Sequence, residues 1–301
     1  MSEGKSGSQP YIYILPAVIL MTVLSLLPNL YSLFIAFTNF SLFHYQDFSF
    51  VGLHNFKKIV AGPEFHTFVR VFAWTLVWAV LSVVLSLGTG LALALPLNVP
   101  ELKGANIYRT LFIVPWAIPI FISVLMWKGL LNSSSQGAFN AILTQFGYSA
   151  IPWLDDPMWA KGSVLFVNVW LSYPFMLTVC LGALQSIPKD LYEAADVDGA
   201  HPIRQFLSVT IPTLKAPLLP VIISSFAFNF NQFAAIYLLT AGGPPVPGGD
   251  AGATDILITY SYKLAFTLYQ YGMACSYAVF IFLIVAALSG FNFRLTGAFD
   301  D

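Results

Sequence analysis

The sequence predicts an all-α polytopic membrane protein with about six transmembrane helices, and two observations support this fold class. Hydrophobic residues make up 57% of the 301-residue chain and charged residues 9%, whereas about 25% of residues are charged in ordinary soluble domains. In addition, long uncharged apolar runs recur along the chain, and the mean hydropathy is +0.76. A net charge of −1 gives no reason to expect a nucleic-acid partner. The expected solvent and partner is therefore membrane lipid.

Each apolar run is long enough for the roughly 20 residues that a spanning helix needs. We expect spanning helices near residues 11–37, 69–95, 108–130, 162–186, 216–240 and 270–293. The first run is too long for the hydrophobic region of a signal peptide, so it is interpreted as a span. Prolines interrupt the third run at Pro115 and Pro119. Because neighbouring helices can satisfy the freed carbonyls, a single kinked span is expected there. With no internal repeat evident, residues 1–301 are expected to form a single transmembrane domain.

An even number of spans places both termini on one side of the membrane. The 13 cations divide almost evenly between the two sides, so the positive-inside rule leaves the orientation open. Cys180 and Cys275 lie in apolar runs and are expected to be small packing residues. The histidines are scattered without metal-ligand spacing. Neither a metal site nor a catalytic constellation is predicted, and the chain is not expected to be an enzyme.

The loop between the fourth and fifth spans, residues 188–212, has the pattern of two short helices joined by a turn. Its key residues are the helix-starting Pro188 and Pro202, the helix formers Ala194 and Ala195, the turn-forming Gly199 and the helix-ending Pro212. The product would be an elbow outside the membrane with a small-residue face. Local residue pattern alone leaves two interpretations equally open, a docking surface for another protein and an ordinary solvated loop.

A motif in this loop resembles the EAA motif of bacterial ABC-importer permeases. Glu193-Ala194-Ala195 is followed after three residues by Gly199, and after nine more by Val209-Thr210-Ile211-Pro212. In that family the elbow is a coupling helix that docks in a cleft of a cytoplasmic ATPase subunit. The resemblance therefore places the loop in the cytoplasm. It implies an ATPase-coupling role for five residues, namely Glu193, Ala194, Ala195, Gly199 and Pro212.

Further segments are similar to maltose/maltodextrin permeases of the F type. They are IPKDLYEAADVDGA, SSFAFNFNQF and LLTAGGP, and the likeness is close from about Pro152 onward. Two extra N-terminal helices and a large periplasmic insertion of that family are lacking, so a compact six-span version is expected. The resemblance implies a type I ABC-importer permease fold in the bacterial inner membrane, with both termini cytoplasmic. The implied partners are a second permease of the G type, two ATPase subunits that bind ATP and Mg²⁺, and a periplasmic or lipid-anchored solute-binding protein. No cofactor of the chain itself is implied.

Two polar stripes with i, i+3, i+4, i+7 spacing lie inside the fourth and fifth spans. They comprise Asn168, Leu171, Ser172 and Phe175 in one span, and Ser225, Phe228, Asn229 and Gln232 in the other. Each stripe places amides and hydroxyls beside an aromatic ring, which suits sugar hydroxyls and the apolar faces of pyranose rings. Asn231 points off the arc and is expected to be structural. An alternative is that these polar residues only join helices together.

The resemblance favours the first interpretation, because these positions match the family's substrate-contacting positions. Three of them depart from the family: Phe175 replaces a tyrosine, Ser172 a glycine and Gln232 an asparagine. The identity of the sugar is therefore open among maltose-type oligosaccharides, trehalose, lactose and other glycosides.

The source of energy separates two classes of transporter. No P-loop motif is present. The six spans hold no Asp, Glu or His near their centres, where a proton-coupled carrier is expected to have one. The sequence therefore favours the membrane subunit of an ATP-driven sugar importer. The alternative is a self-sufficient secondary carrier or channel for a polar solute.

Overall fold

The computed structural model describes residues 9–295. Within this range the regular structure is helical, apart from one isolated antiparallel bridge between Thr38 and Phe50. Two compact units are present. The first unit is Met1–Phe65 with Ser261–Phe282, and the second is His66–Tyr260 with Leu283–Asp301.

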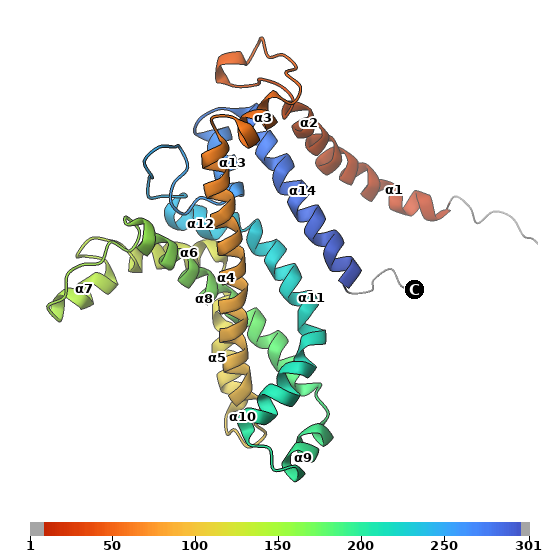
Figure 1. The fold of residues 1–301 in the computed structure, drawn as a ribbon, viewed down its shortest axis with the longest axis vertical. Coiled ribbons are helices and arrows are strands. Elements are labelled where there is room, and N and C mark those ends of the chain that lie inside the picture. The colour runs from red at the N-terminus through yellow and green to blue at the C-terminus, as the bar shows by residue number, and fades with distance from the viewer. Residues whose placement is uncertain (1–8, 296–301) are drawn as a thin grey trace, which may run out of the picture. The chain divides into compact units, whose positions relative to one another are not determined.

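The apolar helices confirm the expected polytopic membrane fold (Figure 1). Among residues 9–295, five helical runs are long and apolar enough to cross a bilayer, namely Tyr11–Ile35, Phe65–Leu97, Pro157–Gln185, Pro202–Phe230 and Tyr271–Gly290. A bent pair of helices, Ala105–Ala117 and Ile120–Leu130, makes a sixth if the pair is counted as one span. These runs correspond to the six predicted regions, although two of the regions are broken where a continuous helix was expected.

The first unit begins with α1 (Gln9–Met21), a π-helical turn at Thr22–Leu26 and α2 (Leu27–Ile35). A 3₁₀ turn at Leu42–His44 and α3 (His54–Ala61) follow, and most of α13 (Leu257–Phe266) and much of α14 (Tyr271–Leu295) complete the unit. Asn55 is buried and donates from Nδ2 to the carbonyls of Ala36 and Thr38 at 3.0 and 2.7 Å. Ser276 also donates to the Ala36 carbonyl, at 2.9 Å. These bonds satisfy carbonyls that the end of α2 would otherwise leave unpaired.

The second unit is built around α4 (Phe65–Leu97), α8 (Pro157–Gln185) and α11 (Ile211–Phe230). The shorter helices of this unit are α5 (Ala105–Ala117), α6 (Ile120–Leu130), α7 (Ala138–Gln145), α9 (Lys189–Val197), α10 (Pro202–Gln205) and α12 (Phe233–Thr240). A buried apolar cluster joins the three long helices near the elbow, through Ala94 and Leu97 of α4, Leu177, Cys180, Ala183 and Leu184 of α8, Ile187 just after α8, and Leu214 and Leu218 of α11. In Figure 1, α9 and α10 lie at one end of these three helices.

α4 and α8 approach each other closely at Gly90. A Cβ built at Gly90 would lie 2.7 Å from backbone atoms of Met176 and Leu177, whereas a Cβ at Gly88 would meet nothing within 4 Å. We therefore expect Gly90→Ala to push the helices apart and lower the free energy of unfolding by about 1–3 kcal/mol. Gly88→Ala should be neutral or slightly stabilising, because Ala has the better helix propensity. Thermal unfolding of the two variants in detergent tests this, and equal melting temperatures would contradict it.

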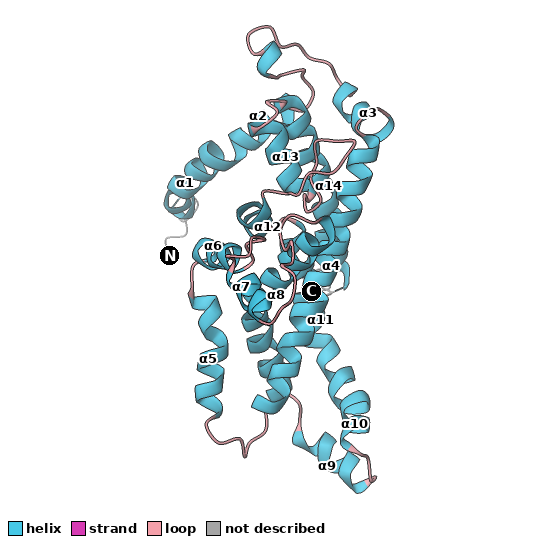
Figure 2. Cartoon of the chain, turned by 90° about the vertical axis from the view of Figure 1, so that its left-hand side faces the viewer, coloured by secondary structure: helices cyan, strands magenta, loops and turns pink. Residues whose placement is uncertain are grey.

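The third predicted span, 108–130, is wrong as a single kinked helix. The structure has two helices, α5 and α6, which meet at 92°, and Figure 2 shows the chain turning between them. Ile118 is extended at φ −86° and ψ 129°, and Pro119 is also non-helical. A residue that precedes proline is driven out of the α region by the proline ring, and Pro119 offers no N–H to continue the helix. The proline pair therefore breaks the span completely.

The fifth predicted span, 216–240, is also interrupted. α11 ends at Phe230 and α12 begins at Phe233, with Asn231 and Gln232 between them in non-helical conformations. Asparagine competes for nearby backbone groups and favours helix ends, and Asn231 caps the C-terminus of α11. Gln232 consequently lies beyond the helix on which the predicted stripe placed it.

Candidate functional site

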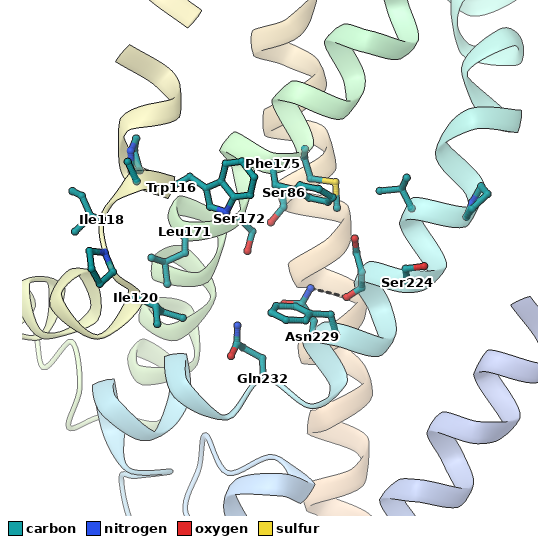
Figure 3. A pocket seen from close by; sticks show the side chains of 18 residues that line it. Ser86, Trp116, Ile118, Ile120, Leu171, Ser172, Phe175, Ser224, Asn229 and Gln232 are labelled. Atoms are coloured by element: carbon teal, nitrogen blue, oxygen red, sulfur yellow. Dashed lines mark hydrogen bonds between the residues drawn. The ribbon is translucent and has the colours of Figure 1, made fainter. Parts of the chain in front are cut away.

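A cavity of about 830 Å³ lies inside the second unit, where α4, α5, α6, α8 and α11 converge (Figure 3). Both interrupted helices border it, since Ile118 and Pro119 line one side and Gln232 lines another. Irregular backbone at membrane depth is tolerated only where it is buried or lines a cavity. The two helix breaks are therefore features of this site.

Most of the predicted stripe residues come together at this cavity. Leu171, Ser172 and Phe175 line it from α8, Ser225, Phe228 and Asn229 line it from α11, and Gln232 lines it from the break after α11. Asn168 does not line the cavity. Helix periodicity thus placed these residues on faces that line one cavity, although it assumed a helix at Gln232 that the structure lacks.

Asn168 and Asn229 form a buried amide pair between α8 and α11. Asn168 is fully buried, and its Nδ2 donates to Asn229 Oδ1 at 2.8 Å. The Asn229 Nδ2 group donates to the Ser225 carbonyl at 2.8 Å, a bond drawn in Figure 3. Trp78 of α4 donates from Nε1 to the Asn229 carbonyl at 3.0 Å. The pair therefore holds three helices together, which is the helix-joining role that the sequence left open.

Other polar groups of the cavity have no comparable protein partner. Gln232 and Ser172 point into the cavity in Figure 3, and the side-chain amide of Gln232 makes no hydrogen bond within residues 9–295. Ser86 of α4 is buried, and its Oγ has no partner in the same range. Buried donors and acceptors without partners are costly. These three side chains are therefore available to hydrogen-bond a polar solute.

Aromatic rings lie beside these polar groups. The rings of Trp116 and Phe175 have centroids 6.1 Å apart and are tilted by 52°. Phe228 is 65% exposed although it belongs to an apolar helix. Exposed ring faces beside amides and hydroxyls suit a ligand that has both apolar and polar faces.

The sequence reasoning missed one side of the cavity. Ser86 and Ser224 line it, as does the segment from Pro115 to Ile120 around the break between α5 and α6. Signals for both regions were present. Ser82, Ser86 and Gly90 form a small-residue stripe along one helix face, and two prolines four residues apart mark a broken membrane helix.

Helix α9 ends at the turn of the elbow, as predicted. Gly199 follows the helix with φ +69°. Its N–H donates to the Asp196 carbonyl at 3.0 Å, and the Ala200 N–H donates to the Ala195 carbonyl at 2.9 Å. This is a Schellman motif, which satisfies the last carbonyls of the helix and uses a glycine because the left-handed conformation strains other residues.

Pro212 does not end a second short helix, and that part of the prediction is wrong. The chain continues without a break from α10 through a π-helical turn at Phe206–Thr210 into α11, so that Pro202–Phe230 is one helical run. Pro212 occupies the first turn of α11, directly after the π-helical turn. The π-helical turn already interrupts the regular hydrogen-bond pattern of the run at this point, so the missing N–H of Pro212 is accommodated there.

Side-chain bonds brace the elbow against the start of this long helical run. The Tyr192 and Thr210 hydroxyls lie 2.9 Å apart. Gln205 donates from Nε2 to Asp196 Oδ1 at 2.5 Å and to the Ala200 carbonyl at 3.0 Å. Because α9 is tied to the run at both ends of the turn, the elbow is expected to move with the run as one body.

The predicted coupling residues face outward. Glu193, Ala194, Gly199 and Pro212 are exposed, and Ala195 is half-buried. Large apolar side chains of the elbow are also exposed, with Val197 at 88%, Ile203 at 66% and Leu207 at 60%. An apolar surface with a charged rim at the end of a bundle is typical of a protein interaction site.

Comparison with known proteins identifies relatives of this chain. Galactooligosaccharides transport system permease protein GanP of Bacillus subtilis (strain 168) is 36% identical over 100% of the chain, which covers 72% of GanP. Maltodextrin transport system permease protein MalC of Streptococcus pneumoniae serotype 4 is 39% identical over 97% of the chain and 70% of MalC. Maltose/maltodextrin transport system permease protein MalF of Vibrio vulnificus (strain YJ016) is 45% identical over 82% of the chain, which spans 48% of MalF.

Solved structures share the fold. A chain of a bacterial ABC transporter involved in the import of the acidic polysaccharide alginate superimposes with a TM-score of 0.72, at 24% identity and 95% coverage of both chains. A chain of the MetNI methionine ABC transporter gives a TM-score of 0.51 at 19% identity, over 79% of this chain and 98% of that one. Residues 85–297 match the family described as binding-protein-dependent transport system inner membrane component. The fold, the elbow and the relatives that match nearly the whole of this chain all agree. The chain therefore belongs to this family of inner membrane permeases of ABC importers.

Proposed function

We propose that the chain is the membrane-spanning permease subunit of an ABC sugar importer. It passes a maltose- or maltodextrin-like oligosaccharide from a binding protein across the inner membrane, driven by ATP hydrolysis in separate subunits. The observation that carries the proposal is the cavity, which combines unpaired hydroxyl and amide groups with exposed aromatic rings. Its volume of about 830 Å³ lies within the roughly 300–1,000 Å³ of small-molecule sites.

The chemistry of the lining favours a neutral, polar solute. Among residues 9–295, no Asp, Glu, Lys, Arg or His lines the cavity. A charged solute inside a membrane protein would need a counter-charge, whereas a sugar needs only hydrogen-bonding groups and stacking faces. The names of GanP, MalC and MalF, which refer to galactooligosaccharides, maltodextrin and maltose, support the same class of solute.

The elbow supplies the route for coupling. Its exposed apolar and acidic surface offers a docking site for a cytoplasmic ATPase, and its braces transmit motion to the helical run Pro202–Phe230. Near its C-terminal end at Phe230, that run carries Phe228 and Asn229, which line the cavity. ATP-driven movement at the elbow would therefore reach the solute site through one continuous helix.

The proposed assembly follows from the single elbow. ABC-importer ATPases act as a two-fold pair in the family that the chain resembles, so one elbow requires a second. The proposed complex contains this chain, a second permease of the G type, two ATPase subunits that bind ATP and Mg²⁺, and a periplasmic or lipid-anchored solute-binding protein. In this assembly the elbow and both termini are cytoplasmic.

Reconstitution tests the proposal directly. The chain, its partner permease, the ATPase and the binding protein are co-purified and placed in liposomes, and uptake of maltose, maltotriose, trehalose and lactose is measured. We expect uptake only when the binding protein and internal ATP are both present, with glucose oligomers preferred. Uptake by the purified chain alone down an imposed proton gradient would instead identify a secondary carrier.

A further inference from the structure

A second cavity, of about 780 Å³, lies between α4 and α8 and is separate from the proposed solute site. Along α4 it is lined by Arg70, Trp74, Val77 and Leu81, which share one helix face. From α8, Lys161 and Leu165 face the same cavity. We call this feature the α4–α8 groove. It lies at the N-terminal ends of both helices, whereas the elbow follows the C-terminal end of α8.

Within the described residues, two cations without a carboxylate partner lie at the end of the groove that is nearest the N-termini of α4 and α8. Neither Arg70 nor Lys161 forms an ion pair within the described residues. Arg70 donates from one terminal nitrogen to the Ala251 carbonyl at 2.8 Å, but its Nε is buried without a partner in that range. The Lys161 ammonium lies 4.6 Å from the centroid of the Trp74 ring. These contacts hold the cations in place and leave their charge uncompensated.

Further along the two helices, toward their C-terminal ends, the groove is apolar. Val77 and Leu81 are 45% and 37% exposed, and Leu165 faces them from α8. Leu81 is eleven positions after Arg70, which corresponds to about 16 Å along a helix. That distance is close to half of the roughly 30 Å hydrocarbon thickness of a bilayer. The groove therefore has the length and polarity of one membrane leaflet, with Trp74 at the level where interfacial aromatic residues occur.

We infer that the α4–α8 groove binds one anionic phospholipid of the leaflet opposite the elbow. The phosphate lies against Arg70 and Lys161, and an acyl chain lies along Val77, Leu81 and Leu165. Charge complementarity identifies the occupant, because two uncompensated cations select an anionic headgroup and the apolar stripe beneath them selects a molecule with a hydrocarbon chain. This lipid site stands independently of the proposed transport function.

Native mass spectrometry of the purified complex tests the inference by titration with dioleoyl phosphatidylglycerol and dioleoyl phosphatidylcholine. We expect the anionic lipid to bind the unmodified complex more tightly. Lys161→Gln should weaken that binding roughly fivefold, because each basic group near an anionic lipid contributes about 1 kcal/mol. The double variant Arg70→Gln/Lys161→Gln should weaken it roughly 30-fold. The control Lys103→Gln with Lys128→Gln likewise removes two cations, both exposed and outside the groove, and should leave binding unchanged.

Two further arms keep the test decisive. Val77→Trp fills the apolar part of the groove without removing a charge or the Arg70–Ala251 bond, and it should displace phosphatidylglycerol. Glycerol 3-phosphate, which has the charge but no chain, should not compete. Equal binding of the two lipids, unchanged binding in Lys161→Gln, or full competition by glycerol 3-phosphate would each overturn the inference. The last outcome would assign the groove to a soluble anion.

Discussion

Gly199→Leu should reduce sugar uptake and binding-protein-stimulated ATP hydrolysis at least tenfold while the protein remains in the membrane. Gly199 has φ +69°, and a left-handed conformation costs a side-chain-bearing residue roughly 1–2 kcal/mol. A Cβ at this position would meet nothing within 4 Å, so backbone strain rather than crowding causes the defect. The chain can relieve the strain only by changing the turn, which breaks the Schellman bonds and redirects α9 away from the proposed ATPase contact.

Gly147 provides a matched control. It ends α7 with φ +79°, with open space around it, and with the same pair of backbone bonds to Thr144 and Leu143. Gly147→Leu should therefore strain the backbone equally but leave coupled transport nearly normal. Gly199→Asn should retain partial activity, because asparagine tolerates the left-handed region better than leucine. Uptake and ATPase rates are measured in proteoliposomes and corrected for protein amount. Equal rates in the two leucine variants would contradict a coupling role for Gly199.

Reversing the charge of Glu193 tests the same surface without changing the backbone. Glu193 is exposed and lies in the middle of α9. We expect Glu193→Lys, like Gly199→Leu, to lower stimulated ATP hydrolysis, because it replaces an acidic group at the proposed ATPase contact. Normal coupled transport in both variants would exclude the elbow from the mechanism.

Gln232→Ala should weaken apparent sugar affinity by roughly five- to 150-fold. Gln232 lines the cavity and its side-chain amide makes no hydrogen bond within the described residues, so its loss would leave a bound sugar hydroxyl unpaired. An unpaired hydroxyl in a buried site costs about 1–3 kcal/mol, and each 1.4 kcal/mol corresponds to tenfold. Uptake measured against sugar concentration, corrected for permease abundance, gives the apparent KM.

The neighbouring Asn231→Ala is the control for this prediction. Asn231 belongs to the same break between α11 and α12 but does not line the cavity, so its removal should leave the KM nearly unchanged. Asn229→Ala would be less informative, since Asn229 is 5% exposed and its amide bonds both Asn168 and the Ser225 carbonyl. A loss of affinity in Asn231→Ala combined with a normal KM in Gln232→Ala would place the sugar site elsewhere.

Apolar length and helix-ending residues were sufficient to predict where the apolar runs lie and that the elbow turns at Gly199, but not the two helix breaks or the continuation of the helix through Pro212. The runs near 69–95 and 162–186 appear as single helices because no proline pair or run of polar residues interrupts them. Gly199 could be predicted because a glycine before a proline-initiated helix is typical of a helix C-terminus. The break at Ile118–Pro119 could not be distinguished from a kink, since whether two prolines bend or separate a helix depends on what packs against the freed backbone groups.

The lining of the cavity was predicted in part for a related reason. Helix periodicity identifies which face a side chain occupies, and it therefore placed Ser172 and Phe228 on faces that line the cavity. It does not show which groups on that face find a protein partner. Asn168 and Asn229 bond each other, whereas Gln232 and Ser86 face the cavity without partners. That difference depends on which helices are neighbours, which local sequence does not specify.

The continuous helical run from Pro202 to Phe230 also fixes an angular register between the elbow and the cavity. Each residue of a helix turns about 100° from the one before it. A single-residue insertion between Pro212 and Ser225 would therefore swing Phe228 and Asn229 by about 100° relative to α9, and two sites joined by a loop would absorb the same change. The number of residues in this run is consequently as constrained as their identity, and length variation among related chains should be found in loops rather than between these two sites.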